Sequence, residues 1–457
     1  MKRTLFLFCY FLLGGLPVPA QQATAMPATL QRYVRQALDS NLVLRQRHLS
    51  LQQSVLALQE ARSYFLPAVE GLAGYQTAGG GRSINIPVGD LLNPVYATLN
   101  QLTGSGKFPT ISNVEEQFFP KNFYDVKLRT TYPIYNPSVR YGAQIAEQKV
   151  RLSEKEVDLY KRELIRDVKS AYYSYLMATE AVRIYEATRV VVQRSLQVNQ
   201  SLYNNGKGLP AYISRSEADL LQVEAQIESS RNDAAKAKAY FNFLLNRGLA
   251  EEVETTDLVL PTLGSWIADE AATKDREELA QLRIAQQINE TLLRLQESNR
   301  MPRISTFLDL GAQAQQMKVD RQAPYYLLGV QLEVPIFQGR RNQYKIAQAR
   351  QQVSQVQLQQ AVVAKQLELA AFSARNNVLT AVTNHRAANK QAEAAQSYFK
   401  LIDRGRAEGS NSYIEWLDAR NQLTLSQIQQ QLSKYRALTA LAEYERQAAT
   451  ATLSDSQ

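Results

Sequence analysis

Alternating apolar and polar residues mark four short segments of the chain. In residues 124–132, Asp125, Lys127 and Arg129 alternate with apolar or aromatic neighbours. The other three segments lie at residues 68–76, 304–313 and 326–334. A period of two residues is typical of a β-strand with one apolar and one polar face. We therefore predict four strands, a pattern that fits a soluble sheet with one wet face as well as a membrane barrel.

Hydrophobic residues three and four positions apart fill long segments between these strands. This spacing predicts helices over residues 29–64, 137–203, 210–244 and 275–299, then from Pro335 to 403, and again up to the polar tail. The clearest seam runs from Leu220 to Leu244 in alternating steps of three and four, as in a coiled coil. Glycines and prolines at 204–210, and glycines at 404–409, predict turns between consecutive long helices. Two long helical hairpins follow from this pattern.

The same order of elements occurs twice: helix, strand, loop, strand and long helical hairpin. Pro133 and Pro335 mark the joint between strand and helix in each half. We expect a first repeat at residues 21–248, a linker at 249–272, a second repeat at 273–450 and a polar tail at 451–457. The loop at 77–121 is long and contains glycines and prolines, which is typical of an exposed external loop, with a short helix near 96–102.

The amino terminus has the pattern of a secretory signal peptide. Lys2 and Arg3 precede an apolar run at residues 5–13, and small residues lead to a cleavage site after Ala20. The run is too short to act as a membrane anchor. Cys9, the single cysteine, lies inside this segment, so the mature chain is expected to form neither a disulfide nor a cysteine metal site.

Charge and the inventory of reactive residues argue against nucleic-acid binding and catalysis. The formal net charge is +9, but the charges are spread along helical faces, which favours a solvated surface over a nucleic-acid interface. The only histidines, His48 and His385, lie singly within helical patterns. We find no metal-ligand cluster, phosphate-binding loop or nucleophile elbow, so we expect no catalytic residues, no cofactor, no metal and no enzyme.

Four strands are too few to close a membrane barrel, because the smallest has eight. An open sheet edge in lipid leaves backbone groups unsatisfied, at several kcal/mol each. A ring of identical chains would pool the strands and cover the apolar helix seams. The alternative is an extended periplasmic coiled-coil structural or adhesion protein without a pore, which explains the heptads but not the four matching strands.

The chain resembles the TolC-like outer-membrane efflux proteins over essentially its whole predicted mature length. The resemblance rests on the repeat plan and on residues 203–209, 276–279, 335–337 and 402–405. It implies a mainly α fold with a small β part: a trimeric twelve-stranded outer-membrane β-barrel, four strands per chain, continued by a long α-helical coiled-coil periplasmic tunnel. It also implies a passive outer-membrane channel of a tripartite efflux or secretion system. The chain would form a homotrimer, and its partners would be a periplasmic adaptor (membrane fusion) protein, an inner-membrane transporter and outer-membrane lipid. The resemblance does not identify the exported substrate.

The resemblance also suggests where such a channel would close and dock. The family's gate has acidic side chains just after the second hairpin turn, and the matching residues here are Tyr413, Glu415 and Asp418. Ser214 occupies the corresponding place in the first repeat, which departs from the family pattern. Glu415 and Asp418 share one helical face, where a threefold ring of acids would select cations, although two ordinary solvated acids would look the same. Candidate adaptor contacts at the turns are Gly206, Lys207, Gly208, Leu209, Arg404, Gly405 and Arg406.

Overall fold

The computed structural model describes residues 26–117, 121–260, 276–315 and 321–449. The predicted signal peptide with Cys9, the end of the predicted linker and the predicted polar tail lie outside these residues. The chain divides into two compact units. The hairpin unit comprises Met1–Gln52, Arg151–Ala285 and Val356–Gln457, and the sheet unit comprises Gln53–Val150 and Gln286–Gln355.

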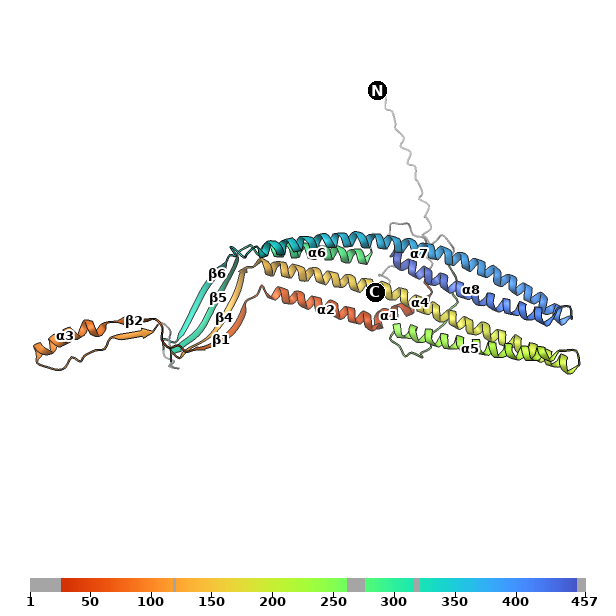
Figure 1. Ribbon diagram of the computed structural model, residues 1–457, viewed down its shortest axis with the longest axis horizontal. Helices are drawn as coiled ribbons and strands as arrows, with labels where there is room; N and C mark the ends of the chain where they lie inside the picture. The colour runs from red at the N-terminus through yellow and green to blue at the C-terminus, as the bar shows by residue number, and fades with distance from the viewer. Residues whose placement is uncertain (1–25, 118–120, 261–275, 316–320, 450–457) are drawn as a thin grey trace, which may run out of the picture. The chain divides into compact units, whose positions relative to one another are not determined.

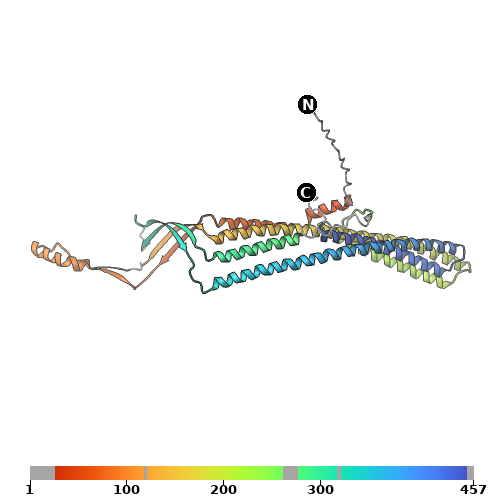
Figure 2. The same ribbon diagram turned by 90° about the horizontal axis from the view of Figure 1, so that it is seen from above.

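Two antiparallel helical hairpins dominate the hairpin unit (Figures 1 and 2). The first joins α4 (Pro137–Asn204) to α5 (Pro210–Leu244), and the second joins α7 (Arg341–Ala407) to α8 (Tyr413–Ala448). The predicted helices and the first turn are confirmed. Among the described residues, no helix combines the length and apolar character needed to cross a bilayer.

The second turn, predicted at residues 404–409, begins later than expected, because α7 continues through Ala407 and therefore contains Arg404, Gly405 and Arg406. The left-handed residue that ends this helix is Gly409, with a φ of 80°. The backbone N–H of Ser410 then donates to the carbonyl of Gly405 at 2.8 Å, which closes the helix end. Gly405 instead allows the side chain of Asn411 to approach the helix backbone closely, since a Cβ at residue 405 would lie 1.8 Å from Oδ1 of Asn411.

The predicted helix at 29–64 is interrupted at Asn41, which separates α1 (Ala28–Ser40) from α2 (Leu42–Ser63). Asn41 has an extended ψ of 125°, and its Oδ1 accepts a hydrogen bond from the backbone N–H of Leu44 at 3.0 Å. Its Nδ2 donates to the carbonyl of Leu244 in α5 at 2.9 Å. A helix cap and a tertiary bond therefore stabilise a break that hydrophobic spacing alone could not indicate.

The core of the hairpin unit lies where α1, α4, α5 and α8 meet. Tyr33, Tyr172 and Phe241 pack with ring centroids 5.1 to 6.0 Å apart, in geometries that favour aromatic pairs. Each ring comes from a different helix, and burying such a side chain contributes roughly 2 kcal/mol. This cluster therefore stabilises α1 against both helices of the first hairpin.

Buried ion pairs hold the start of α6 (Glu277–Ser298) within the hairpin unit. Arg162 of α4 donates from Nε to Glu277 at 2.9 Å, and a second guanidinium nitrogen donates to the same carboxylate at 2.5 Å. Arg276 is buried and donates to the backbone and side chain of Gln447 in α8. Because these charges are buried, each depends on its partner.

His385 lies between α7 and α8 in a network that requires the neutral ring. Ser433 Oγ donates to the carbonyl of Gln430, so the hydroxyl is left to accept from His385 Nδ1 at 3.1 Å. Asn389 Oδ1 accepts from Gln430, so its Nδ2 donates to His385 Nε2 at 3.1 Å. Burial lowers the pKa of His385 below its usual 6.5, and the nearby Lys434 acts in the same direction.

The sheet unit contains four antiparallel strands in the order β1-β4-β5-β6 (Figure 1). Their bounds are Ala68–Gln76, Phe123–Tyr135, Arg303–Gln315 and Pro324–Glu333, which confirms the four predicted strands. One face is largely apolar and exposed. On the opposite face Asp309 is 1% exposed and accepts two hydrogen bonds of 2.7 Å from Arg129.

Phe307 covers the backbone of Gly329 on the neighbouring strand. A Cβ at that glycine would lie 2.5 Å from Cζ of the ring. The sheet therefore needs a residue without a side chain at this position.

The loop predicted as largely irregular at 77–121 contains ordered structure. The predicted helix is confirmed and is longer than expected, as α3 (Val88–Thr103). A two-stranded antiparallel sheet of β2 (Ser83–Ile86) and β3 (Val114–Gln117), on either side of α3 in the chain, was missed. The side chain of Asn93 bonds both backbone groups of Ile111 at 2.8 Å, and the side chain of Asn100 does the same for Phe108. These asparagines hold the returning chain against α3.

Candidate functional site

Arg406 links the two hairpins near their turns. From the last turn of α7 it donates to Ser195 Oγ at 3.1 Å and to Asn199 Oδ1 at 3.0 Å, both on α4. Its guanidinium lies 4.4 Å from the ring centre of Trp416 and 5.1 Å from that of Tyr413. Such cation–π contacts are attractive, most strongly when desolvated. We call Ser195, Asn199, Arg406, Tyr413 and Trp416 the Arg406 cluster.

Three further contacts fix this cluster. Trp416 donates from Nε1 to Asp403 at 2.7 Å, which orients the indole beneath Arg406. Ser216 of α5 accepts from Asn199 at 2.7 Å and lies 2.8 Å from the Tyr413 hydroxyl. Burial lowers the pKa of Arg406, but arginine keeps its charge at any physiological pH. The cluster is therefore a cationic link between α4 and α5 on one side and α7 and α8 on the other.

A second link, between Arg420 of α8 and Asp219 of α5, is buried and loosely made. The closest nitrogen and oxygen are 3.6 Å apart, and Asp219 Oδ2 and Arg420 Nε find no hydrogen-bond partner in the described part of the chain. Burial lowers the pKa of Arg420, while Asp219 opposes this effect. A buried pair with unsatisfied groups contributes little net stability.

The structure separates the predicted gate residues. Tyr413 is 7% exposed and belongs to the Arg406 cluster, whereas Glu415, Asp418 and Ser214 are exposed. Glu415 has a local task as the N3 residue of a capping box, where it accepts from the backbone N–H of Ser412 at 2.8 Å. That hydrogen bond, together with others from side chains at the turn, lowers the pKa of Glu415.

The predicted adaptor contacts lie partly in the first hairpin turn and partly in the last turn of α7. Gly206, Lys207, Gly208 and Leu209 form the first hairpin turn, and Gly206 has a φ of 71°. Arg404 is exposed on α7, while Gly405 is buried and Arg406 is half-buried within the cluster.

Sequence reasoning missed most residues of the two links. Ser195, Asn199, Ser216, Asp219 and Arg420 are polar, yet each is buried on a helix face that packs against a neighbour. Ser216 and Asp219 continue the spacing of the buried Val223 and Ile227. Polar residues on an otherwise apolar seam were therefore the available signal.

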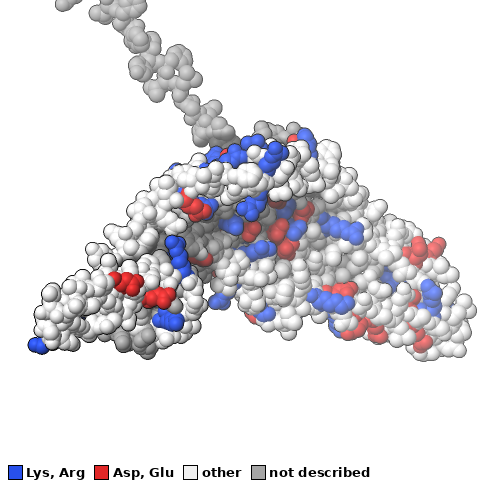
Figure 3. Space-filling model, turned by 60° about the vertical axis from the view of Figure 1, so that its left-hand side comes forward, with Lys and Arg blue, Asp and Glu red and all other residues white. Residues whose placement is uncertain are grey.

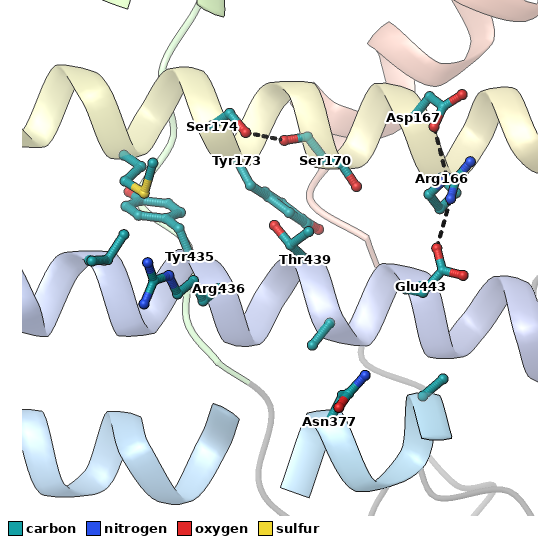
Figure 4. Close-up of a pocket in the computed structure, with 14 residues that line it drawn as sticks. Arg166, Asp167, Ser170, Tyr173, Ser174, Asn377, Tyr435, Arg436, Thr439 and Glu443 are labelled. Atoms are coloured by element: carbon teal, nitrogen blue, oxygen red, sulfur yellow. Dashed lines mark hydrogen bonds and ion pairs between the residues drawn. The ribbon is translucent and has the colours of Figure 1, made fainter. Parts of the chain in front are cut away.

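A groove of about 690 Å³ lies between α4, α7 and α8 (Figure 4). Arg166 lies 2.7 Å from Asp167 and 2.8 Å from Glu443, so its charge is compensated. Burial raises the pKa of Asp167. Burial also acts on Glu443, but hydrogen bonds from neighbouring side chains outweigh it and lower that pKa. Basic and acidic residues are likewise interspersed on the face in Figure 3. We therefore assign this groove no binding role.

Comparisons with known proteins agree with this architecture. The family model described as "Outer membrane efflux protein" matches residues 33–247 and 270–450. A search of curated protein sequences gave no match. Solved structures with the same fold include two outer-membrane channels and one outer-membrane protein.

The CmeC channel of Campylobacter jejuni is 13% identical with a TM-score of 0.74, and the alignment covers 98% of this chain and 94% of that one. VceC of Vibrio cholerae is 14% identical with a TM-score of 0.73, covering 92% and 96%. The open state of MtrE from Neisseria gonorrhoeae is 17% identical with a TM-score of 0.68, covering 92% and 88%. CmeC and MtrE are outer-membrane channels. The chain therefore belongs to the outer membrane efflux protein family and is an outer-membrane efflux channel.

Proposed function

We propose that three copies of this chain form one channel, in which twelve strands close a barrel in the outer membrane. The supporting observation is that β1 and β6 each have one neighbour in the sheet, while the apolar face is exposed. Open edges in lipid are unstable, and four strands cannot close. The two repeats, residues 21–248 and 273–450, would each supply two strands and one hairpin.

The apolar face of the sheet has the dimensions of a bilayer core. Tyr124 and Tyr132 lie near opposite ends of β4, with Val126 and Leu128 between them on the same face. Eight residues at about 3.3 Å each span roughly 26 Å, close to the apolar band of outer-membrane barrels. Tyrosines at both ends match the aromatic girdles of such barrels.

Two measurements test this placement. Sedimentation of the protein in detergent should give a particle of three chains, and a single-chain particle would contradict the proposal. Leu128→Lys, on the apolar face, should reduce the amount assembled in the outer membrane several-fold. Gln313→Lys adds the same charge on the polar face and should assemble normally. Equal behaviour of the two variants would mean that the apolar face does not meet lipid.

We further propose that the hairpin ends form the closed periplasmic mouth, with Glu415 and Asp418 lining it. Both are exposed on α8 next to the Arg406 cluster. In a trimer each acid would occur three times around a narrow pore, which favours cations. Glu415→Gln with Asp418→Asn should raise single-channel conductance and weaken cation preference in planar bilayers, since glutamine can keep the capping box. Glu408→Gln, an exposed acid of the same turn, is the control, and an identical response would remove the two acids from the gate.

The partners we propose are a periplasmic adaptor and, through it, an inner-membrane transporter. The first hairpin turn exposes Leu209 beside Lys207, an apolar and a basic group suited to protein contact. A photocrosslinker at Lys207 should capture the adaptor encoded with this channel, and one at Arg231, farther along α5, should not. Equal capture at both positions would argue against docking at the turn.

A further inference from the structure

Four connections between the sheet and its helices meet at one end of the sheet. The register pairs Ala68 with Thr131, Pro133 with Ser305 and Arg303 with Glu333. Four helices therefore join the sheet at this end of its strands (Figure 1). They are α2 and α6, which end there, and α4 and α7, which begin there.

Large apolar side chains at these connections are unusually exposed. Ile336 is 95% exposed and Phe337 is 83% exposed, in the segment between β6 and α7. Ile336 continues the even-numbered apolar series of β6 beyond the end of that strand, and Ile134 is the last member of the corresponding series within β4. Exposed residues that extend an apolar face indicate that the surface covering this face reaches beyond the strands.

Four exposed basic residues lie at the helix ends next to these connections. Arg341 begins α7 and Arg340 directly precedes it. Arg62 lies at the end of α2, and Arg300 lies two residues after the end of α6. None of the four has a carboxylate within ion-pair distance among the described residues, where Glu297 pairs instead with Arg350. Gly339 and Arg340 both have left-handed φ values near 60°, so a tight turn fixes the arginines relative to Phe337.

We propose that this joint collar, comprising Ile134, Ile336, Phe337, Arg62, Arg300, Arg340 and Arg341, binds anionic phospholipids. Ile336 and Phe337 would lie among the acyl chains, while the arginines would donate to headgroup phosphates, which the planar guanidinium recognises in bidentate fashion. The distance fits, because Arg340 lies four positions after Ile336, which corresponds to a span of at most about 13 Å. An anionic phospholipid complements the positive charge of the four arginines, which an apolar protein surface would not do. The inference rests on the proposed placement of the sheet in the membrane.

Quenching by brominated lipids tests the joint collar directly. Phe337→Trp places a reporter at the site, and the parent protein, whose tryptophans are Trp266 and Trp416, supplies the background. The full-length channel is reconstituted in mixtures of phosphatidylglycerol and phosphatidylcholine, with one or the other brominated. We expect stronger quenching by brominated phosphatidylglycerol than by equal amounts of brominated phosphatidylcholine.

Charge variants then identify the headgroup contact. Arg340→Gln with Arg341→Gln should reduce the phosphatidylglycerol preference by roughly fivefold per arginine. Arg340→Lys with Arg341→Lys should retain most of it. Arg375→Gln with Arg386→Gln removes two exposed arginines from the hairpin unit and should leave the preference unchanged.

Three results would overturn the inference. Equal quenching by both lipids, with normal channel conductance, means that the joint collar meets lipid without headgroup selection. Absence of quenching by either lipid, with normal conductance, means that protein covers it. Absence of both quenching and conductance means that the sheet does not insert, which refutes the proposed placement itself.

Discussion

Replacing Arg406 by alanine tests whether the two hairpins are held together by the Arg406 cluster. The substitution removes two hydrogen bonds from a charged donor, to Ser195 and Asn199, and the contact with Trp416. Hydrogen bonds to charged groups contribute about 1.5 to 3 kcal/mol, and a partly desolvated cation–π contact about 1 kcal/mol. Because Arg406 is half-buried, water recovers part of this loss. We expect a net cost of about 2 to 3 kcal/mol in the contact between the hairpins.

Arg404→Ala is the matched control, since Arg404 lies in the same helical turn but is exposed. Thermal unfolding should show a lower Tm for Arg406→Ala and a change near zero for Arg404→Ala. In planar bilayers the Arg406 variant should open more often, because a closed state weakened by about 2 kcal/mol shifts its equilibrium by roughly thirtyfold per chain.

A double-mutant cycle separates the link from general damage. Arg406→Ala and Asn199→Ala share one hydrogen bond, so their effects on opening should be less than additive, with a coupling of about 1 to 2 kcal/mol. Additive effects, or equal opening by the Arg404 and Arg406 variants, would refute the view that this cluster holds the hairpins together.

Three further predictions concern stability. The pKa of His385 is lowered in the folded state, so the contribution of its neutral ring to the free energy of unfolding is fully present above pH 6.5 and is lost as the pH falls through the folded pKa. His385→Asn should therefore flatten the dependence of Tm on pH between pH 7 and pH 5. Arg162→Met should cost about 3 to 5 kcal/mol in chemical denaturation because Glu277 is left buried and uncompensated, whereas adding Glu277→Leu should recover most of this loss. Gly329→Ala should reduce the heat resistance of the folded sheet in gel-shift assays, since the new Cβ meets the Phe307 ring, and Phe307→Ala should relieve that effect; an unchanged response in any of the three would contradict its stated cause.

Hydrophobic spacing by itself determined the four-stranded sheet and the two helical hairpins of this protein. The period of two located all four strands of the sheet, and the period of three and four located both hairpins. These signals are strong because each element buries or exposes a whole face, so every second or every third and fourth residue carries the same information. The repeat plan and the resemblance built on it led to the outer membrane efflux family.

Only the tertiary structure decided which polar residues matter and where helices break. Asn41 ends α1 because its side chain finds Leu44 and Leu244, which lie 3 and 203 residues away. The helix α7 continues past Gly405 to Ala407 and the turn follows at Gly409, while Gly405 is needed where Asn411 approaches the helix. Ser216 and Asp219 resemble interruptions of a seam until Asn199 and Arg420 are placed opposite them. Periodicity reports how a segment meets its surroundings on average, whereas a hydrogen bond depends on two particular atoms brought together by the fold.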